Sequence, residues 1–212
     1  MTLRISMTTI LCVLTLAAGL SADAKTDQLL ADVQKKYDTL KSVCADFTQT
    51  FYWKLTGETQ VIKGKICVRE GDQFKIDTPD QFIVTNGTTL WTLNKVNNQV
   101  VIDRPENSSG DNPFIKNFLA KYLTEYSSQP ETTAAEPGMT CVRLTSKTGE
   151  HFIPQLRLWI DEKSQLIYKV EQMDVNDNTT VFQIENIDTA AQLTPRDFTF
   201  TVPDGADVID MR

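Results

Sequence analysis

Short alternating segments separated by turn residues are the feature that most limits how this chain can fold. Apolar and polar residues alternate with a period of two along them, as at Leu156, Leu158 and Ile160, and this is typical of strands with one buried face. Asn86-Gly87 accepts positive φ at both positions and predicts a tight hairpin. The expected strands are residues 44–53, 60–68, 73–77, 81–85, 88–94, 99–103, 139–145, 152–160, 165–173, 179–187 and 196–202.

Two amphipathic helices are expected beside the strands. Apolar residues recur near the helical period from Thr26 to Leu40, and Asn112-Pro113 supplies a cap and a first-turn proline for a second helix whose apolar stripe reaches Tyr126. Residues 127–138 are rich in Ser, Thr, Ala and Pro and predict a loop. About eleven strands and two helices favour one mainly β (α+β) domain, built as a barrel or a strongly curled antiparallel sheet with the helices over an open face or end.

The first 24 residues predict a secretory signal peptide. Arg4 gives a basic start, residues 10–20 are mostly apolar, and Ala22-Asp23-Ala24 matches a small-x-small cleavage site. A membrane anchor is the alternative, but the apolar run is well short of the ~20 residues that a spanning helix needs. We therefore expect residues 1–24 to be removed and residues 25–212 to form a single exported domain.

Three cysteines remain after the leader, and an oxidising compartment permits disulfides. Cys44 and Cys67 are equidistant from the turn-like residues 54–58, so a hairpin there would place them nearly opposite each other. This spacing predicts a Cys44–Cys67 bridge. The alternative is three small buried or half-buried residues, with Cys141 as the third, and their spacing fits no zinc motif.

Composition disfavours several classes of function. The chain has a net charge of −7, which disfavours nucleic-acid binding because that function needs clustered basic charge. The single histidine, His151, cannot build a multi-histidine metal site and fits a strand residue better than a catalytic one. No glycine-rich phosphate loop, Gly-x-Ser-x-Gly or Cys-x-x-Cys occurs. We expect no enzymatic activity, metal or cofactor, while a pair of carboxylates that meet across the fold stays open.

Apolar and aromatic residues are more numerous than one face of a thin sheet needs. Two interpretations are open: a filled core, or a barrel whose partly open interior holds an acyl chain, with the second helix as a lid. The candidate cavity or lid residues are Phe47, Phe74, Ile76, Phe82, Val84, Trp91, Phe114, Phe118 and Leu119.

Several segments, taken in order, resemble a known family. They are residues 37–49, 64–68 leading to Phe74, 85–91, 112–114 and 198–210. Together they resemble the periplasmic outer-membrane lipoprotein carriers of the LolA family over nearly all of residues 25–212. The resemblance implies an incomplete antiparallel barrel closed by a helical lid, and a monomeric carrier that has neither catalytic activity nor a cofactor.

The resemblance also implies partners. Such carriers take acylated lipoproteins from an inner-membrane ABC lipoprotein-releasing transporter, shield the acyl chains in a hydrophobic cavity, and deliver them to the outer membrane, to a lipoprotein receptor where one is present. Two rivals remain. One is a regulator that uses the same half-barrel to sense lipids or mislocalised lipoproteins, although such sensors usually carry a second domain. The other is a small periplasmic hydrolase with convergent carboxylates.

One position departs from the family's pattern. Family members commonly carry an arginine before the turn that precedes the aromatic aligned with Phe74, and this arginine is implicated in holding the lid closed. Here that position is Glu70, with Arg69 beside it. Neighbouring strand residues face opposite sides, so Arg69 is the candidate for lid control only if a bulge or a one-residue slip turns it inward.

Overall fold

The computed structural model describes residues 17–107, 124–134 and 136–212, and side chains of the first helix from Ala24 onward. Among these residues, helix α1 (Ala17–Thr39) precedes the strands, and three short 3₁₀ turns interrupt them: η1 (Pro105–Asn107), η2 (Thr132–Ala134) and η3 (Pro195–Phe198). The strands are β1 (Ser42–Tyr52), β2 (Thr59–Arg69), β3 (Gln73–Asp77), β4 (Gln81–Thr85), β5 (Leu90–Asn94), β6 (Gln99–Asp103), β7 (Tyr126–Pro130), β8 (Met139–Ser146), β9 (Gln155–Asp161), β10 (Leu166–Met173), β11 (Thr179–Asp188) and β12 (Asp207–Asp210).

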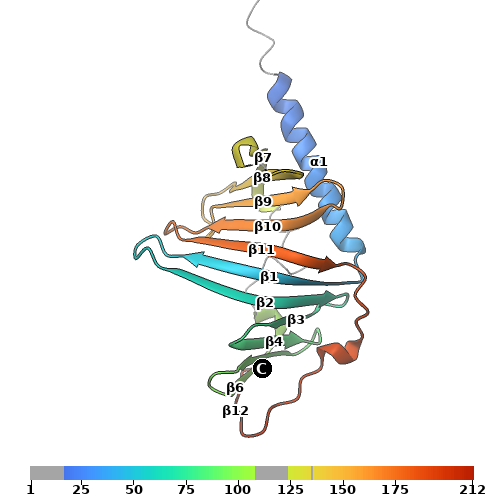
Figure 1. The fold of residues 1–212 in the computed structure, drawn as a ribbon, viewed down its shortest axis with the longest axis vertical. Helices are drawn as coiled ribbons and strands as arrows, with labels where there is room; N and C mark the ends of the chain where they lie inside the picture. Colours follow the sequence, from blue (N-terminus) through green and yellow to red (C-terminus); the bar gives the residue numbers. More distant parts are fainter. Residues whose placement is uncertain (1–16, 108–123, 135) are drawn as a thin grey trace, which may run out of the picture.

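The described strands form one open sheet of twelve, in the order β12-β6-β5-β4-β3-β2-β1-β11-β10-β9-β8-β7 (Figure 1). All neighbouring strands are antiparallel except β12, which lies parallel to β6. The sheet consists of two meanders, β1–β6 and β7–β11, joined where β1 pairs with β11. The prediction of a mainly β fold around a large antiparallel sheet is therefore confirmed.

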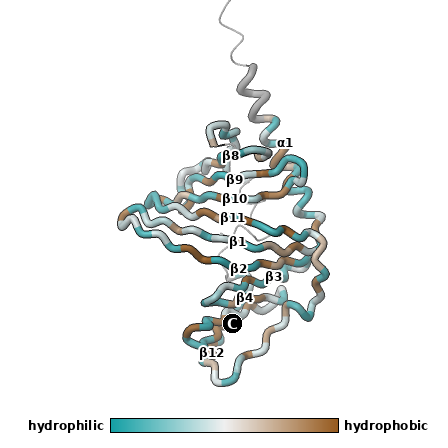
Figure 2. The backbone as a smooth tube through the Cα atoms, viewed as in Figure 1, coloured by the Kyte–Doolittle hydropathy of each residue, from teal (hydrophilic) through white to brown (hydrophobic). Residues whose placement is uncertain are grey.

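The main core lies on one face of this sheet, here called the inner face. Hydrophobic residues recur along the strands (Figure 2), and opposed residues on neighbouring strands share a face, as Ile66, Ile76 and Ile83 do. Helix α1 packs against β7 and β10, and Leu30 and Val33 on it are fully buried in the core. The amphipathic stripe expected after Thr26 thus covers one end of the inner face.

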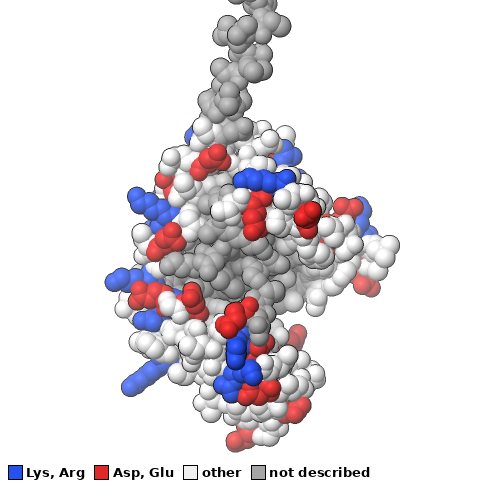
Figure 3. Space-filling view, turned by 180° about the vertical axis from the view of Figure 1, so that it is seen from behind, with Lys and Arg blue, Asp and Glu red and all other residues white. Residues whose placement is uncertain are grey.

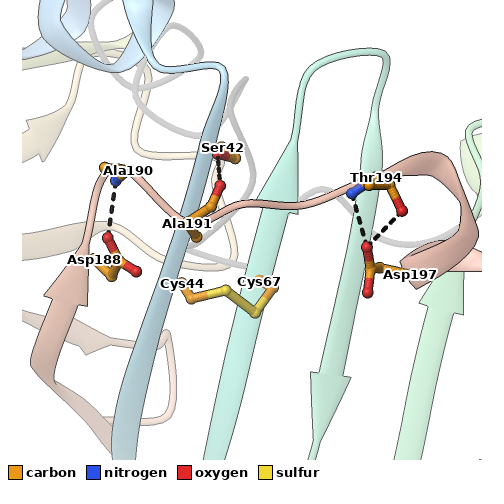
Figure 4. Close-up of a disulfide and its surroundings, with 8 residues drawn as sticks. All are labelled: Ser42, Cys44, Cys67, Asp188, Ala190, Ala191, Thr194 and Asp197. Carbon is orange, nitrogen blue, oxygen red and sulfur yellow. Dashed lines mark hydrogen bonds between the residues drawn. A yellow bond between two sulfur atoms is a disulfide. The ribbon is translucent and has the colours of Figure 1, made fainter.

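The opposite, outer face carries a second apolar cluster beneath the end of the chain. After β11 the C-terminal segment (residues 189–206) crosses this face, anchored by a hydrogen bond of 2.5 Å from Ser42 Oγ to the Ala191 carbonyl (Figure 4). Phe198 is fully buried, and the Phe200 ring lies 6.2 Å from Phe82 and 6.1 Å from Trp91. The C-terminal segment therefore covers the outer face of this part of the sheet.

Three stretches differ from the sequence prediction, and one of them is β12, because no strand was expected over residues 207–210. The loop expected over residues 127–138 contains β7 and η2, and Tyr126, expected in a helix, begins β7. β7 is an edge strand of mostly polar residues, so hydropathy alone does not reveal it. The strand expected over residues 196–202 is also wrong: Pro195 starts η3, whose Asp197 carboxylate accepts a 2.7 Å hydrogen bond from the Thr194 backbone N–H (Figure 4).

The remaining strands lie within a few residues of their expected positions, and β3, β4 and β6 coincide with them. The second helix and its residues Phe114, Phe118 and Leu119 fall in residues 108–123, outside the described part of the chain. Among the described residues, no helix has the length and apolar character needed to span a membrane.

Candidate functional site

An apolar pocket of about 40 Å³ opens on the inner face, where β1 begins and β2 and β11 end. None of its lining side chains is charged, and the Tyr37 hydroxyl is the polar group among them. The lining residues are Tyr37 from α1, Val43 and Ala45 from β1, Ile66 and Val68 from β2, Ile167 from β10, and Ile184 and Ile187 from β11. Such a surface suits hydrocarbon and offers nothing to a charged ligand.

Strand alternation around the two half-cystines builds half of the pocket. Cys44 lies opposite Cys67, and the residues on either side of each point to the other face of the sheet. Val43, Ala45, Ile66 and Val68 therefore all face the pocket, while the sulfur atoms lie on the outer face. Cys44 and Cys67 form a disulfide, with an S–S distance of 2.08 Å, and this is the pairing that the sequence spacing predicts.

A bulge in β11 supplies two more lining residues. Between Cys44 and Asp46 of β1, the partner on β11 moves from Asp188 to Glu185, so β11 carries one extra residue. Asn186 occupies the left-handed region at φ 51°, and its side-chain amide donates a 2.8 Å hydrogen bond to the Asp46 carboxylate. The extra residue lets Ile184 and Ile187, three positions apart, both reach the pocket.

Tyr37 closes the pocket from the helix side. The register of β10 shifts between Ile167 and Lys169, and the Ile167 backbone N–H donates a 3.2 Å hydrogen bond to the Tyr37 hydroxyl oxygen. Burial raises the pKa of Tyr37 from 10.0 to about 12, because the phenolate would lose its hydration. The hydroxyl is therefore neutral at physiological pH and satisfies a backbone donor in the wall.

Replacing Tyr37 by Phe should lower the free energy of unfolding by about 1 kcal/mol at pH 7, because the Ile167 N–H loses its acceptor. The folded-state pKa lies above the unfolded value, so the contribution of Tyr37 is fully present below pH 10 and is lost as the pH rises through 12. The two pKa units correspond to at most roughly 2.7 kcal/mol. Urea unfolding of the unchanged protein and of Tyr37→Phe between pH 7 and 12 measures the difference in their free energies of unfolding. A difference that stays constant with pH would contradict the prediction.

Three predicted cavity residues lie beside the pocket without lining it. Phe47, Phe74 and Ile76 are buried on the inner face, in the main core. Each is directly opposed to a lining residue: Phe47 to Ile184, Phe74 to Val68, and Ile76 to Ile66. They belong to the inner-face core that flanks the pocket.

The other three described candidates face the opposite way. Phe82, Val84 and Trp91 lie on the outer face, where Val84 is opposed to Lys75 and to Trp91. Sequence reasoning placed all six residues around one interior, and the structure divides them between two faces. Period-two alternation cannot decide the matter here because Ile83 and its two neighbours are all apolar.

Arg69 also lies on the outer face. The register from Val68 to Arg69 is regular against Phe74 and Gln73, so no bulge turns its side chain inward. Its guanidinium donates a 2.9 Å hydrogen bond to the Gln73 side-chain carbonyl and lies 3.8 Å from the Glu70 carboxylate. Arg69 therefore does not reach the apolar pocket.

The charged groups of the described residues offer little for acid–base catalysis. His151 lies 3.6 Å from the Glu125 carboxylate and stacks on Tyr126 of the edge strand β7, whereas the strands that line the pocket lie in the middle of the sheet. An open polar hollow of about 780 Å³ carries two carboxylates, Glu106 and Asp210. Hydrogen bonds from Arg212 lower the pKa of Asp210 to about 2, far from the neutral range that proton transfer favours. The described residues contain no cluster of three metal-ligating side chains.

Charge is mixed over the surface as well. Acidic and basic side chains are interspersed on the face shown in Figure 3, without a continuous basic area. The lack of a continuous basic area on this face agrees with the net charge of −7.

Comparison with known proteins identifies the family. The profile of the family described as "Outer membrane lipoprotein carrier protein LolA" matches residues 38–201. The chain belongs to the LolA family. An outer-membrane lipoprotein carrier protein of Haemophilus ducreyi is 28% identical over 201 residues, 93% of this chain and 92% of the relative. A carrier protein of Alkalilimnicola ehrlichii is 27% identical over 191 residues, 85% of this chain and 83% of its own length.

Solved structures share the fold. An uncharacterised conserved protein from Thermus thermophilus superposes with a TM-score of 0.58 at 12% identity, covering 86% of this chain and 98% of that protein. MucB gives a TM-score of 0.50 at 12% identity, covering 84% of this chain and 63% of MucB. At these identities the likeness concerns the fold alone.

Proposed function

We propose that this protein is a periplasmic carrier that shields the acyl chains of lipoproteins and shuttles them from the inner to the outer membrane. The observation that carries the proposal is the apolar pocket of a LolA-family sheet, whose lining includes no charged side chain. Each acyl methylene withdrawn from water contributes roughly 0.8 kcal/mol, so acyl chains cannot cross an aqueous compartment without an apolar container. Its partners would be acylated lipoproteins, an inner-membrane ABC lipoprotein-releasing transporter and, where present, an outer-membrane receptor.

The size of the pocket bears on how a carrier releases its cargo. A cavity of about 40 Å³ admits a few methylene-sized groups, so a whole acyl chain must part the surrounding side chains to enter. Part of the binding free energy is then used to open the wall, and the net affinity falls. Weaker binding favours transfer to an acceptor without an energy source at the carrier.

Competition binding tests this proposal. A fluorescent fatty-acyl probe should bind the purified protein, and a synthetic triacylated lipopeptide should displace it, whereas the same peptide without acyl chains should not. Displacement by both peptides, or no probe binding, would contradict lipid carriage. Acceptor vesicles then separate carrier from sensor: a carrier passes the lipopeptide to the vesicles, while retention would favour the regulator.

The leader belongs to the same proposal. Cleavage between Ala24 and Lys25, both exposed on α1, would leave Leu30, Val33 and Tyr37 in the exported domain. The intact mass of protein recovered from the periplasm should correspond to residues 25–212. A mass that retains residues 1–24 would contradict export by a cleaved signal peptide.

A further inference from the structure

The two halves of the pocket wall are held in different ways. On one side, β1 and β2 pair in unbroken register from Ser42 opposite Arg69 to Tyr52 opposite Thr59. On the other side, both strands that line the pocket are irregular, because β11 bulges at the level of Cys44 and β10 shifts register beside Ile167. An extra residue loosens the local ladder, so the β10–β11 side is the more adjustable one.

The disulfide lies directly behind the regular half. Four of the eight lining residues are the immediate chain neighbours of Cys44 and Cys67. A covalent link across opposed residues on the outer face therefore keeps the two strands from separating or sliding at the level of the pocket. Cys67 is only 4% exposed, and the C-terminal segment crosses close to the bridge, where Ser42 contacts Ala191 (Figure 4).

We propose that the Cys44–Cys67 disulfide is a positioning element for acyl-chain binding, which holds the β1–β2 wall rigid so that the pocket widens only on the β10–β11 and Tyr37 side. This inference rests on the proposed carrier function. A preformed wall lowers the ordering cost of binding and limits how far a chain can enter. The bridge therefore raises affinity and makes it depend on acyl-chain length.

The test compares oxidised and reduced protein with saturated fatty acids of 12, 14, 16 and 18 carbons as ligands, measured by calorimetry. Dithiothreitol breaks the S–S bond and leaves two thiols, while it is itself oxidised to a cyclic disulfide; alkylation and mass spectrometry confirm reduction. We expect the dissociation constant for the preferred chain to rise roughly five- to twentyfold on reduction and the preference among the four lengths to flatten. The number of binding sites should stay the same.

Two variants serve as controls. Cys44→Ser combined with Cys67→Ser should reproduce the reduced behaviour and show no response to dithiothreitol. Cys141→Ala removes the buried free thiol on β8, away from the pocket, and should keep the oxidised affinity and its response to the reductant. A merely structural role of the bridge would lower the number of sites equally for all four acids and leave the dissociation constants unchanged.

The outcomes are distinguishable from those of the carrier proposal. Absence of fatty-acid binding by the oxidised protein would contradict the carrier function itself. If the oxidised protein binds and the reduced protein binds equally well or more tightly, or if only the site number falls, the positioning role is overturned while the carrier function stands.

Discussion

Replacing Gly64 by Val is expected to lower the free energy of unfolding by about 3 kcal/mol or more, although valine is a better strand residue than glycine. Gly64 lies opposite Phe47 on the inner face, and a Cβ there would be 2.6 Å from the Asp77 carbonyl oxygen and 2.7 Å from the Phe47 ring. One obstacle is backbone and the other is a buried ring, so neither can give way cheaply. Urea unfolding followed by circular dichroism measures the loss.

Gly57→Ala is the matched control. Gly57 has a φ of 72°, and a Cβ there would meet nothing within 4 Å. Its cost is therefore the left-handed backbone alone, about 1 kcal/mol. Equal losses of unfolding free energy in the two variants would contradict this account. They would show that the cost at Gly64 comes from the backbone and not from contact with the Phe47 ring and the Asp77 carbonyl.

Replacing Val43 by Trp should raise the dissociation constant for a fatty-acyl probe at least about tenfold, which corresponds to 1.4 kcal/mol. Val43 is half-buried and lines the pocket near the start of β1, so an indole ring there can occupy the cavity of about 40 Å³ without entering the tightest part of the core. Tryptophan also suits a strand, and the fold should persist. Probe titration monitored by fluorescence measures the effect.

Thr48→Trp provides the comparison for this variant. Thr48 lies on the same strand but faces the outer side, opposite Lys63, so the added ring is directed away from the pocket. Its probe affinity should equal that of the unchanged protein. A similar loss in both variants would indicate that a bulky residue disturbs β1 in general, and that the pocket described here is not where the probe binds.

Much of the fold follows from local patterns. The alternation in β9 is decided by a few neighbouring residues and appears where expected. A turn at Asn86-Gly87 also joins β4 to β5, but it spans residues 86–89, and of the pair only Gly87 has a positive φ. β7 was missed because an edge strand needs only one partner and tolerates polar residues on both faces. The strand expected over residues 196–202 is wrong because the spacing of the apolar residues Phe198 and Phe200 is typical of a strand. In the structure Pro195 starts a 3₁₀ turn, and both phenylalanines pack in the outer-face cluster.

The site was harder to predict than the fold, for two physical reasons. Aromatic residues dominate the sequence signal, but the pocket is lined mainly by small and branched aliphatic residues, while Phe47 and Phe74 lie beside it on the same face. The bulge at Asn186, which turns Ile187 inward, depends on the pairing of β11 with β1 and leaves no local pattern. A usable signal did exist: placing Cys44 and Cys67 on one face assigns Val43, Ala45, Ile66 and Val68 to the other.

The seam between β1 and β11 has a consequence for the order in which the protein folds. Each meander contains mostly short-range pairings and can form early, but Phe47 must find Ile184, far along the chain. A chain synthesised from its N-terminus therefore presents β1 with one unpaired edge until β11 has emerged. That edge can pair with other chains in the interval, so we expect the chain to be most prone to aggregation just before β11 emerges.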